Sequence, residues 1–223
     1  MRWQNRAGGA TEGGVRDDTD GLSMRPDRRR PWLGTVEMRT YLSVNREFVP
    51  IEESPVPKNW SEYEAGAVQL VINGRAIIGQ EQWDDIEPLW MLLAGLVTTI
   101  SKGASYATVS FPDQPIPVGI ALQADDLVVV VCGRGERRRR AVADKRTFFE
   151  AFCRAGIDAF DHFERLGGGR HAALARQSLV QCLDDLYQGE WPNLRTTRCI
   201  GVEKAAAAEA EAKAFFGVHR LAW

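Results

Sequence analysis

The sequence predicts an α+β protein in which a mainly antiparallel sheet packs against a central helix and two C-terminal helices. Three observations lead to this fold class. Apolar and polar residues alternate over residues 36–44, and Asn73-Gly74 joins two further strand patterns. A long helical pattern follows at residues 82–102, and a run of short strands then precedes two more helical patterns. Because strands and helices form separate runs along the chain, an antiparallel arrangement is expected.

The first strand, at residues 36–44, is predicted by its period of two, which is typical of a strand with one buried face. Residues 50–65 contain three prolines and several acidic residues, so we expect a surface loop there. A second strand at residues 67–72 is expected to turn at Asn73-Gly74, because this pair favours the positive φ angles of a type I′ turn. Residues 75–78 return as the next strand.

Residues 82–102 are expected to form the central helix. Apolar residues at helical spacing cover most of its circumference, which indicates a buried helix. Asp84, Asp85 and Glu87 would then place negative charge in its first turn, where the helix dipole favours it. Gly103 is expected to end the helix.

A β-meander is predicted after this helix, and two further helices close the domain. The four strands of the meander are expected at residues 106–111, 116–122, 127–132 and 137–142. The third is very apolar and is expected to be interior, and the fourth is expected to be an edge strand. Asp144 or Thr147 can cap the next helix, which carries a face of phenylalanines. The glycines at 167–169 separate it from the last helix, at about residues 170–187.

Three segments are expected along the chain. Residues 1–31 are rich in Gly, Arg and Asp without periodicity, which predicts a disordered leader. Residues 32–189 are expected to form a single α+β domain. Residues 190–223 form a C-terminal extension, in which residues 203–216 (EKAAAAEAEAKAFF) predict an Ala-rich helix that is exposed or docked on a partner.

Composition excludes several classes of function. Of the 223 residues, 44% are hydrophobic and 26% are charged, and the net charge is −2, which is ordinary for a soluble globular protein. This charge balance favours neither nucleic acid nor an anionic membrane as the partner. The longest apolar stretch is too short to span a bilayer, and no secretory signal is visible. We therefore expect a cytoplasmic protein.

Motifs for cofactors, metals and nucleophilic catalysis are missing from the sequence. Cys132, Cys153, Cys182 and Cys199 form no CxxC pair, so they are expected to be reduced, structural thiols. The chain also lacks a GxSxG elbow, a Walker A loop and a strand-linked GxGxxG. The sequence therefore predicts no metal site, no cofactor and no recognisable catalytic set.

The run of arginines at Arg134, Arg137, Arg138, Arg139 and Arg140 is the conspicuous charge cluster. Alternate members of a strand point to opposite faces, so only part of the run can form one patch. One interpretation is an edge strand that positive charge protects against aggregation, and this needs no ligand. The other is a site for phosphate or for an acidic protein surface, with Arg134, Arg137, Arg138 and Arg140 as candidate binding residues.

Two other groups are candidates for an enzyme site. Asp84, Asp85 and Glu87 could hold a hard cation or act as an acid–base pair, although helix N-terminal charge explains them without a site. His162 and Asp158 have the i, i+4 spacing of metal ligands, but no second His or Cys lies at a companion spacing, and a solvated helix face explains them. An enzyme with a non-local site near Asp84/Asp85 or His162 remains the alternative.

Five features span residues 66–166. They are a hairpin that turns at NG, a Trp-containing helix, an FPDQP turn, the apolar strand DDLVVVVCG and a long Phe-rich helix. In this combination the chain resembles the small α+β immunity-type proteins of bacterial toxin–antitoxin and polymorphic toxin systems. The resemblance implies a non-enzymatic, cytoplasmic protein-binding module that neutralises a partner protein, such as a toxin. The arginine run and the Ala-rich helix have no counterpart in this resemblance.

Overall fold

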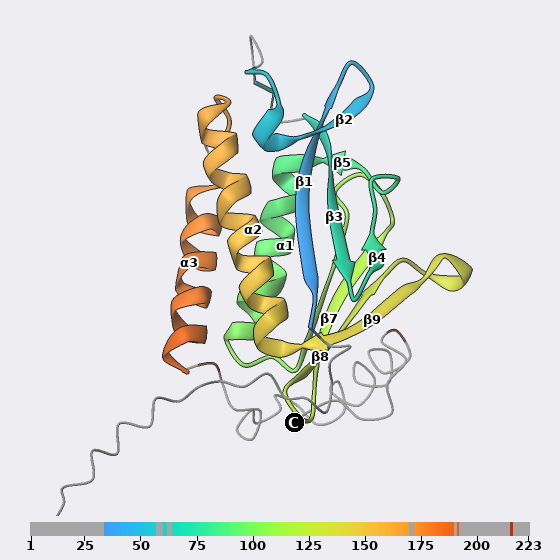
Figure 1. The fold of residues 1–223 in the computed structure, drawn as a ribbon, viewed down its shortest axis with the longest axis vertical. Helices are drawn as coiled ribbons and strands as arrows, with labels where there is room; N and C mark the ends of the chain where they lie inside the picture. The colour runs from blue at the N-terminus through green and yellow to red at the C-terminus, as the bar shows by residue number, and fades with distance from the viewer. Residues whose placement is uncertain are drawn as a thin grey trace, which may run out of the picture. The chain divides into compact units, whose positions relative to one another are not determined.

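A computed structural model describes residues 34–56, 60–61, 64–169, 172–189, 191 and 215. In these residues the chain forms two antiparallel sheets and three α-helices, which confirms the α+β fold class (Figure 1). The strands belong to two separate sheets, whereas the sequence predicted one. The expected leader at residues 1–31 and almost all of the extension at residues 190–223 lie outside the described residues.

The first sheet, sheet A, has five strands in the order β2-β1-β3-β4, and β5 pairs with the beginning of β3. Its strands are β1 (Val36–Val44), β2 (Glu47–Pro50), β3 (Ala65–Ile72), β4 (Arg75–Ile78) and β5 (Asp84–Asp85). Strands β1, β3 and β4 follow the prediction, and Asn73 and Gly74 have the positive φ angles expected of their turn. The loop predicted at residues 50–65 is shorter at both ends, because β2 includes its first residue, a 3-10 turn follows at Ile51–Glu53, and β3 includes its last.

The second sheet, sheet B, is the predicted meander, in the order β6-β7-β8-β9. Its strands are β6 (Tyr106–Ser110), β7 (Pro117–Gln123), β8 (Leu127–Cys132) and β9 (Arg139–Asp144). Strand β9 is at the edge of the sheet, as predicted, but it begins at Arg139 instead of residue 137. A 3-10 turn at Gly135–Arg137 precedes it, so Arg134, Arg137 and Arg138 are outside the strand.

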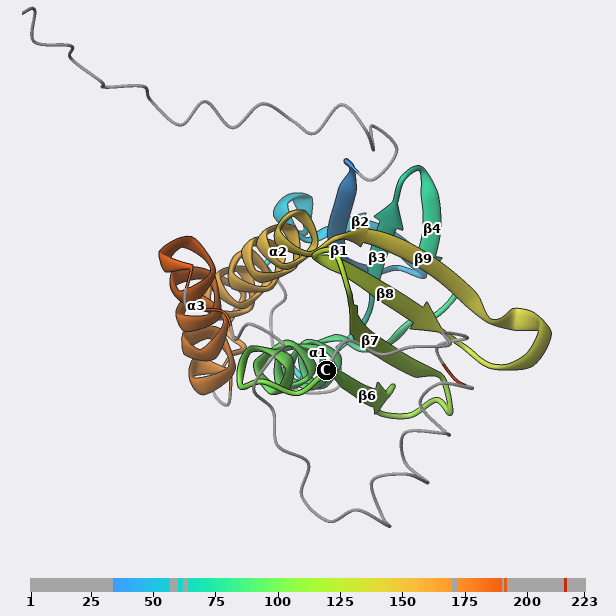
Figure 2. The same cartoon turned by 90° about the horizontal axis from the view of Figure 1, so that it is seen from below.

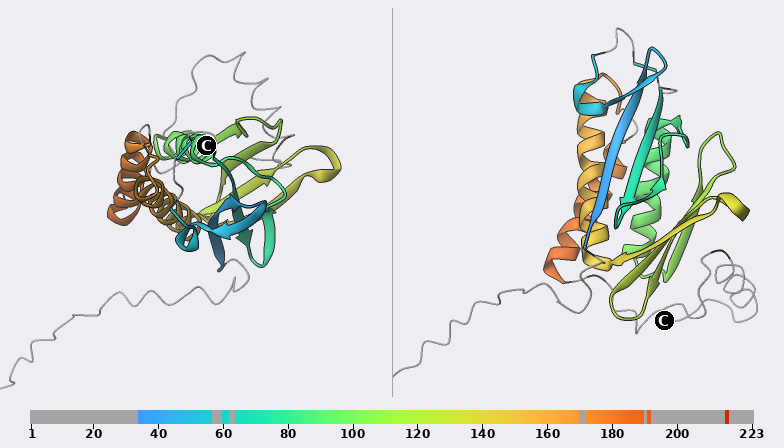
Figure 3. Two further views of the ribbon diagram at one scale, coloured as in Figure 1. Left: turned by 90° about the horizontal axis from the view of Figure 1, so that it is seen from above. Right: turned by 45° about the vertical axis from the view of Figure 1, so that its right-hand side comes forward.

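The helices are α1 (Ile86–Ser101), α2 (Lys145–Arg165) and α3 (Ala173–Gln188). Helices α1 and α2 contact the sheets, and α3 packs on α1 and α2 (Figures 2 and 3). Helix α1 begins four residues later than predicted, because Asp84 and Asp85 pair with β3. Asp144 caps α2, since its carboxylate accepts the backbone N–H of Thr147 at 2.8 Å. No helix in the described ranges is long and apolar enough to cross a membrane.

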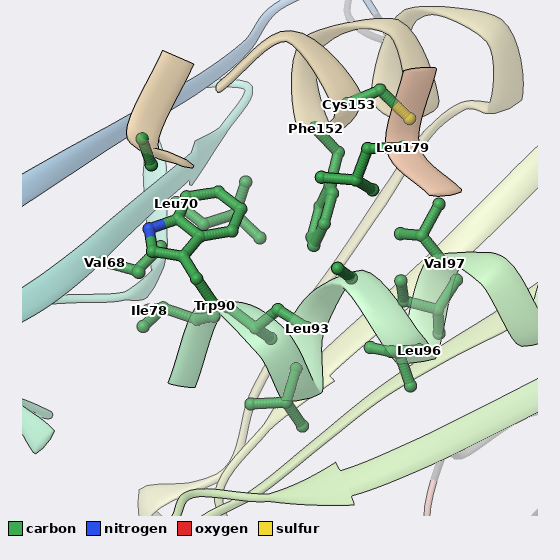
Figure 4. Close-up of a cluster of buried hydrophobic side chains, with 14 of the residues drawn as sticks. Val68, Leu70, Ile78, Trp90, Leu93, Leu96, Val97, Phe152, Cys153 and Leu179 are labelled. Carbon is green, nitrogen blue, oxygen red and sulfur yellow. The ribbon is translucent and has the colours of Figure 1, made fainter. Parts of the chain in front are cut away.

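The core is centred on Trp90 of α1, whose side chain is fully buried (Figure 4). Its ring meets Phe152 and Phe160 of α2 edge-on, and its indole Nε1–H donates to Thr40 Oγ1 of β1 at 3.0 Å. One residue therefore connects the central helix, the Phe-rich helix and sheet A. The expected interior position of α1 and the aromatic face of α2 are both confirmed.

The cysteines in the described part are Cys132, Cys153 and Cys182, and all three are buried and free. Burial raises the pKa of each thiol, and it raises that of Cys132 to about 11. A thiol with such a pKa is protonated at neutral pH and is therefore a poor nucleophile. This agrees with their expected structural role, while Cys199 lies outside the described residues.

Candidate functional site

Sheet B buries apolar side chains on both of its faces. Alternate residues of β8, Val128, Val130 and Cys132, join the main core beside the helices. The residues between them, Val129 and Val131, belong to a second, separate cluster on the opposite face. We call this opposite face, turned away from α1 and α2, the outer face of sheet B. The apolar run of β8 follows from this burial on both sides.

The strand register places the outer face in two rows of four residues, read from β6 to β9. One row is Tyr106, Ala121, Val129 and Val142, and the other is Thr108, Gly119, Val131 and Arg140. The residues from β7 are the smallest in each row, so the middle of the face is low. Hydroxyl groups lie at the β6 edge, apolar side chains in the centre and an arginine at the β9 edge.

A cavity of about 560 Å³ opens on this side of sheet B. Its lining includes Thr108 and Ser110 of β6, Arg134 and Arg138 before β9, and the ring of Phe215. Cavities of this size accept drug-sized molecules or several side chains of a partner. None of its described lining residues is an acid, a histidine or a cysteine, so the described lining offers cationic and hydroxyl groups but no acid–base pair.

The candidate arginines are only partly brought together. Arg134 and Arg138, which precede β9, line the cavity, and Arg140 of β9 pairs with Val131 on the outer face. Arg137 is exposed on the 3-10 turn and does not line the cavity. Arg139 is bound elsewhere, because its guanidinium pairs with Glu81 at 2.6 Å.

Arg140 is in an unusual environment for a cation. Its Nε is buried and has no hydrogen-bond partner among the described residues. Burial lowers the pKa of its guanidinium, and the charge of Arg138 lowers this pKa further. Buried polar atoms nearly always have a hydrogen-bond partner. An unpaired guanidinium nitrogen in a buried position therefore suggests that a bound molecule supplies the acceptor.

The acidic candidates form a second group, at a different place. One carboxylate oxygen each from Asp84, Asp85 and Asp113 lies within 4.8 Å of the others. Asp84 is buried and accepts the backbone N–H groups of Asp85, at 2.8 Å, and of Asp113, at 3.2 Å. The prediction that Asp84 and Asp85 charge the first helical turn is therefore wrong. They precede the helix as β5, and Asp84 fixes the turn at Asp113.

The charge of Asp85 is unfavourable in this group. Burial raises the pKa of its carboxyl, and the neighbouring charges of Asp113 and Asp84 raise it further. The folded state therefore binds the Asp85 proton more tightly than the unfolded chain does, and ionisation of Asp85 lowers stability at neutral pH. Asp85 also precedes α1 as its N-cap without a side-chain capping bond.

We predict that Asp85→Asn raises the melting temperature at pH 7, because the amide removes the unfavourable charge and is an equally good N-cap residue. The gain should shrink as the pH falls and vanish below about pH 4, where the wild-type carboxyl is protonated in both states. Differential scanning calorimetry between pH 3 and 7 measures this. Asp158→Asn, on the exposed face of α2, is the control. A lower melting temperature at pH 7 would contradict the prediction and show that the charge itself is needed.

His162 is not assembled into a site by the described residues. Its Nδ1 lies 2.8 Å from the backbone carbonyl oxygen of Asp158, one helical turn earlier. The neighbouring Asp161 pairs with Arg176 of α3 at 2.5 Å. In the described part of the chain, the group of Asp84, Asp85 and Asp113 is the one set of three metal-ligand side chains that lie close together, and it does not include His162.

No protein-family model, curated protein or solved structure matches this chain. The outer face must therefore be interpreted from its own residues. Sequence reasoning missed Thr108, Ser110 and Phe215, because their place in the cavity depends on strand register and on a contact distant in sequence. The uninterrupted apolar run of β8 was the available signal, since a strand with one solvated face would alternate.

Proposed function

We propose that the protein is a non-enzymatic protein-binding module that binds an acidic partner protein through the outer face of sheet B. The orphaned Nε of Arg140 carries this proposal. An unpaired buried polar group costs about 1–3 kcal/mol, and more when it is charged, so an acceptor supplied by a partner would recover that free energy. Arg138 lies close enough for its charge to lower the pKa of Arg140, so it adds positive charge beside the proposed acceptor.

The chemistry of this face favours a carboxylate on a protein surface. Guanidinium groups bind carboxylates through two parallel hydrogen bonds, which gives both strength and orientation. The half-buried Arg140 is at the β9 edge of this face, paired with Val131 of the buried apolar cluster, so a carboxylate bound there would be partly shielded from water. Arginines next to a desolvated apolar patch are typical of the residues that dominate the energy of protein–protein interfaces.

The identification of the partner as a toxin depends on the resemblance to immunity-type proteins. Such proteins act by binding and covering a partner, and the outer face offers a sheet surface of suitable chemistry for this purpose. Within the proposal, the partner is a toxin that carries an acidic patch, and the complex forms in the bacterial cytoplasm.

A comparison of two double variants tests the proposal. Affinity capture from the native host would use the wild type, Arg138→Gln/Arg140→Gln, and the control Arg39→Gln/Arg75→Gln, which removes two exposed arginines from sheet A. We expect a protein with an acidic surface to be retained by the wild type and the control and lost by the first variant. Equal retention by all three would refute the proposed surface.

The same variants test the interpretation of β9 as a protected edge. If the arginines only prevent sheet-to-sheet association, Arg138→Gln/Arg140→Gln should aggregate at concentrations where the wild type is monomeric, without any loss of partner binding. Size-exclusion chromatography over a concentration series measures this. The proposed function predicts the opposite pattern, with binding lost and solubility retained.

An enzyme at the acidic group is the second candidate function. The raised pKa of Asp85, next to Asp84 and Asp113, favours it, because such shifts accumulate at acid–base sites. The structural role of Asp84 in the turn at Asp113 explains the same group without catalysis. A cation requirement would appear as a rise in the wild-type melting temperature on adding Ca²⁺ or Mg²⁺ that Asp85→Asn abolishes.

A further inference from the structure

We infer that the outer face of sheet B is also a docking groove for the chain's own C-terminal segment, residues 203–216, with Phe215 as its anchor. Phe215 packs against the cluster of Ala121, Val129 and Val131, and its ring lines the cavity. These contacts join positions more than eighty residues apart in the sequence.

The cluster needs a cover that the sheet itself does not supply. Ala121, Val129 and Val131 are at most 1% exposed, although they lie on the face that α1 and α2 leave open. The other members of the cluster, Tyr106 and Val142, stand at the two sides of the same row. Phe215 is the one described member that comes from outside the sheet. Its ring lies on a face where β7 contributes the small residues Gly119 and Ala121.

The sequence of the segment fits this groove. Alanine fills most of residues 203–214, so a helix there could approach the sheet closely, and its helix propensity is high. Phe215 itself is in helical conformation. Glu211 comes four residues before Phe215 in the sequence, the spacing at which side chains are neighbours in any helix. The segment therefore combines an aromatic ring with a carboxylate, and the groove combines an apolar floor with arginines.

Docking of the C-terminal segment would affect partner binding. This effect is the one part of the inference that rests on the proposed function. The C-terminal segment and the acidic partner would use the same face, so they would compete. A partner would have to displace Phe215 before it reached the floor of the groove. Removal of the Phe215 ring should then increase partner retention.

Solution NMR of the full chain with labelled alanine and valine methyl groups tests docking without any partner. The ring of Phe215 should shift the methyl resonances of Ala121, Val129 and Val131 upfield, and we expect Phe215→Ala and Phe215→Leu to abolish these shifts. Phe216→Ala is the matched control, because it removes an identical ring from the next position of the chain. If Phe215→Ala unfolds the chain, Phe215→Leu can still be used to test whether the shifts come from the ring, since it retains an apolar side chain without a ring.

A peptide of residues 203–216 added to the Phe215→Ala chain completes the test. We expect the wild-type peptide to restore the upfield shifts saturably and the same peptide with Phe215→Ala to have no effect. Docking is refuted if the Phe215 variants leave the three methyl resonances unchanged, or if both peptides act alike. If docking is confirmed while neither the wild type nor the Phe215→Ala chain captures an acidic partner, the proposed function is refuted and this inference stands.

Discussion

Trp90→Ala is expected to lower the free energy of unfolding by about 3–5 kcal/mol, the range for truncation of a fully buried large aromatic side chain. The substitution removes the edge-on contacts with Phe152 and Phe160 and leaves Thr40 Oγ1 without its indole donor. Because α1, α2 and sheet A all meet at this ring, the resulting cavity cannot close by a local shift. Equilibrium urea denaturation, followed by circular dichroism, measures the change.

Trp83→Ala is the matched control for this experiment. Trp83 is 50% exposed and lies just before α1, so its truncation should cost far less, within about 1 kcal/mol. A loss below about 1 kcal/mol for Trp90→Ala would contradict the described core. It would mean that α1 is peripheral and that Trp90 belongs to the surface.

Gly66→Ala has the second large expected effect, a loss of about 3 kcal/mol, near the upper end of the usual cost of overpacking. A Cβ atom at Gly66 would lie 2.5 Å from the backbone oxygen of Tyr41 and 2.8 Å from Cβ of Ile86. Neither atom can rotate away, because β1 and the start of α1 are held on both sides of β3. The strands would have to separate, which breaks the pairing of sheet A.

Gly95→Ala makes the same chemical change where space is available. Gly95 is exposed on α1, and a Cβ atom there would meet nothing within 4 Å. Alanine is the better helix former, so this variant should gain about 0.5–1 kcal/mol. Thermal melts of both variants would separate the effects, and a stable Gly66→Ala protein would refute the close packing of β1, β3 and α1.

The local parts of the fold were predictable from the sequence because their causes are local. The turn at Asn73-Gly74 depends on two residues that tolerate positive φ, and the aromatic face of α2 depends on helical spacing. The beginning of α1 was not predictable in this way. Asp84 and Asp85 look like the acidic first turn of a helix, but pairing with β3 and the hydrogen bonds to the turn at Asp113 hold them in extended conformation.

The sequence predicted the arginines of the candidate site but not the shape of the outer face. The arginine run correctly indicated the edge strand of the meander, and alternation in a strand indicated that only part of the run could form one patch. Which arginines share the patch did not follow from the sequence, since Arg137 was among the candidates and does not line the cavity. The low centre of the outer face depends on the register that places Gly119 and Ala121 between Thr108, Tyr106 and the valines of β8. Register and the contact of Phe215 are properties of the folded chain, which no sequence period encodes.

The central claim is that Arg138 and Arg140 bind an acidic partner, and the salt dependence of the association rate tests it most directly. The captured partner would be mixed with the wild type and with Arg138→Gln/Arg140→Gln in a stopped-flow instrument at low and high NaCl. The claim predicts that the wild-type rate falls as salt screens the charges, and that the variant associates at least roughly tenfold more slowly at low salt with a flatter salt dependence. Equal rates and equal salt slopes for the two proteins would contradict it.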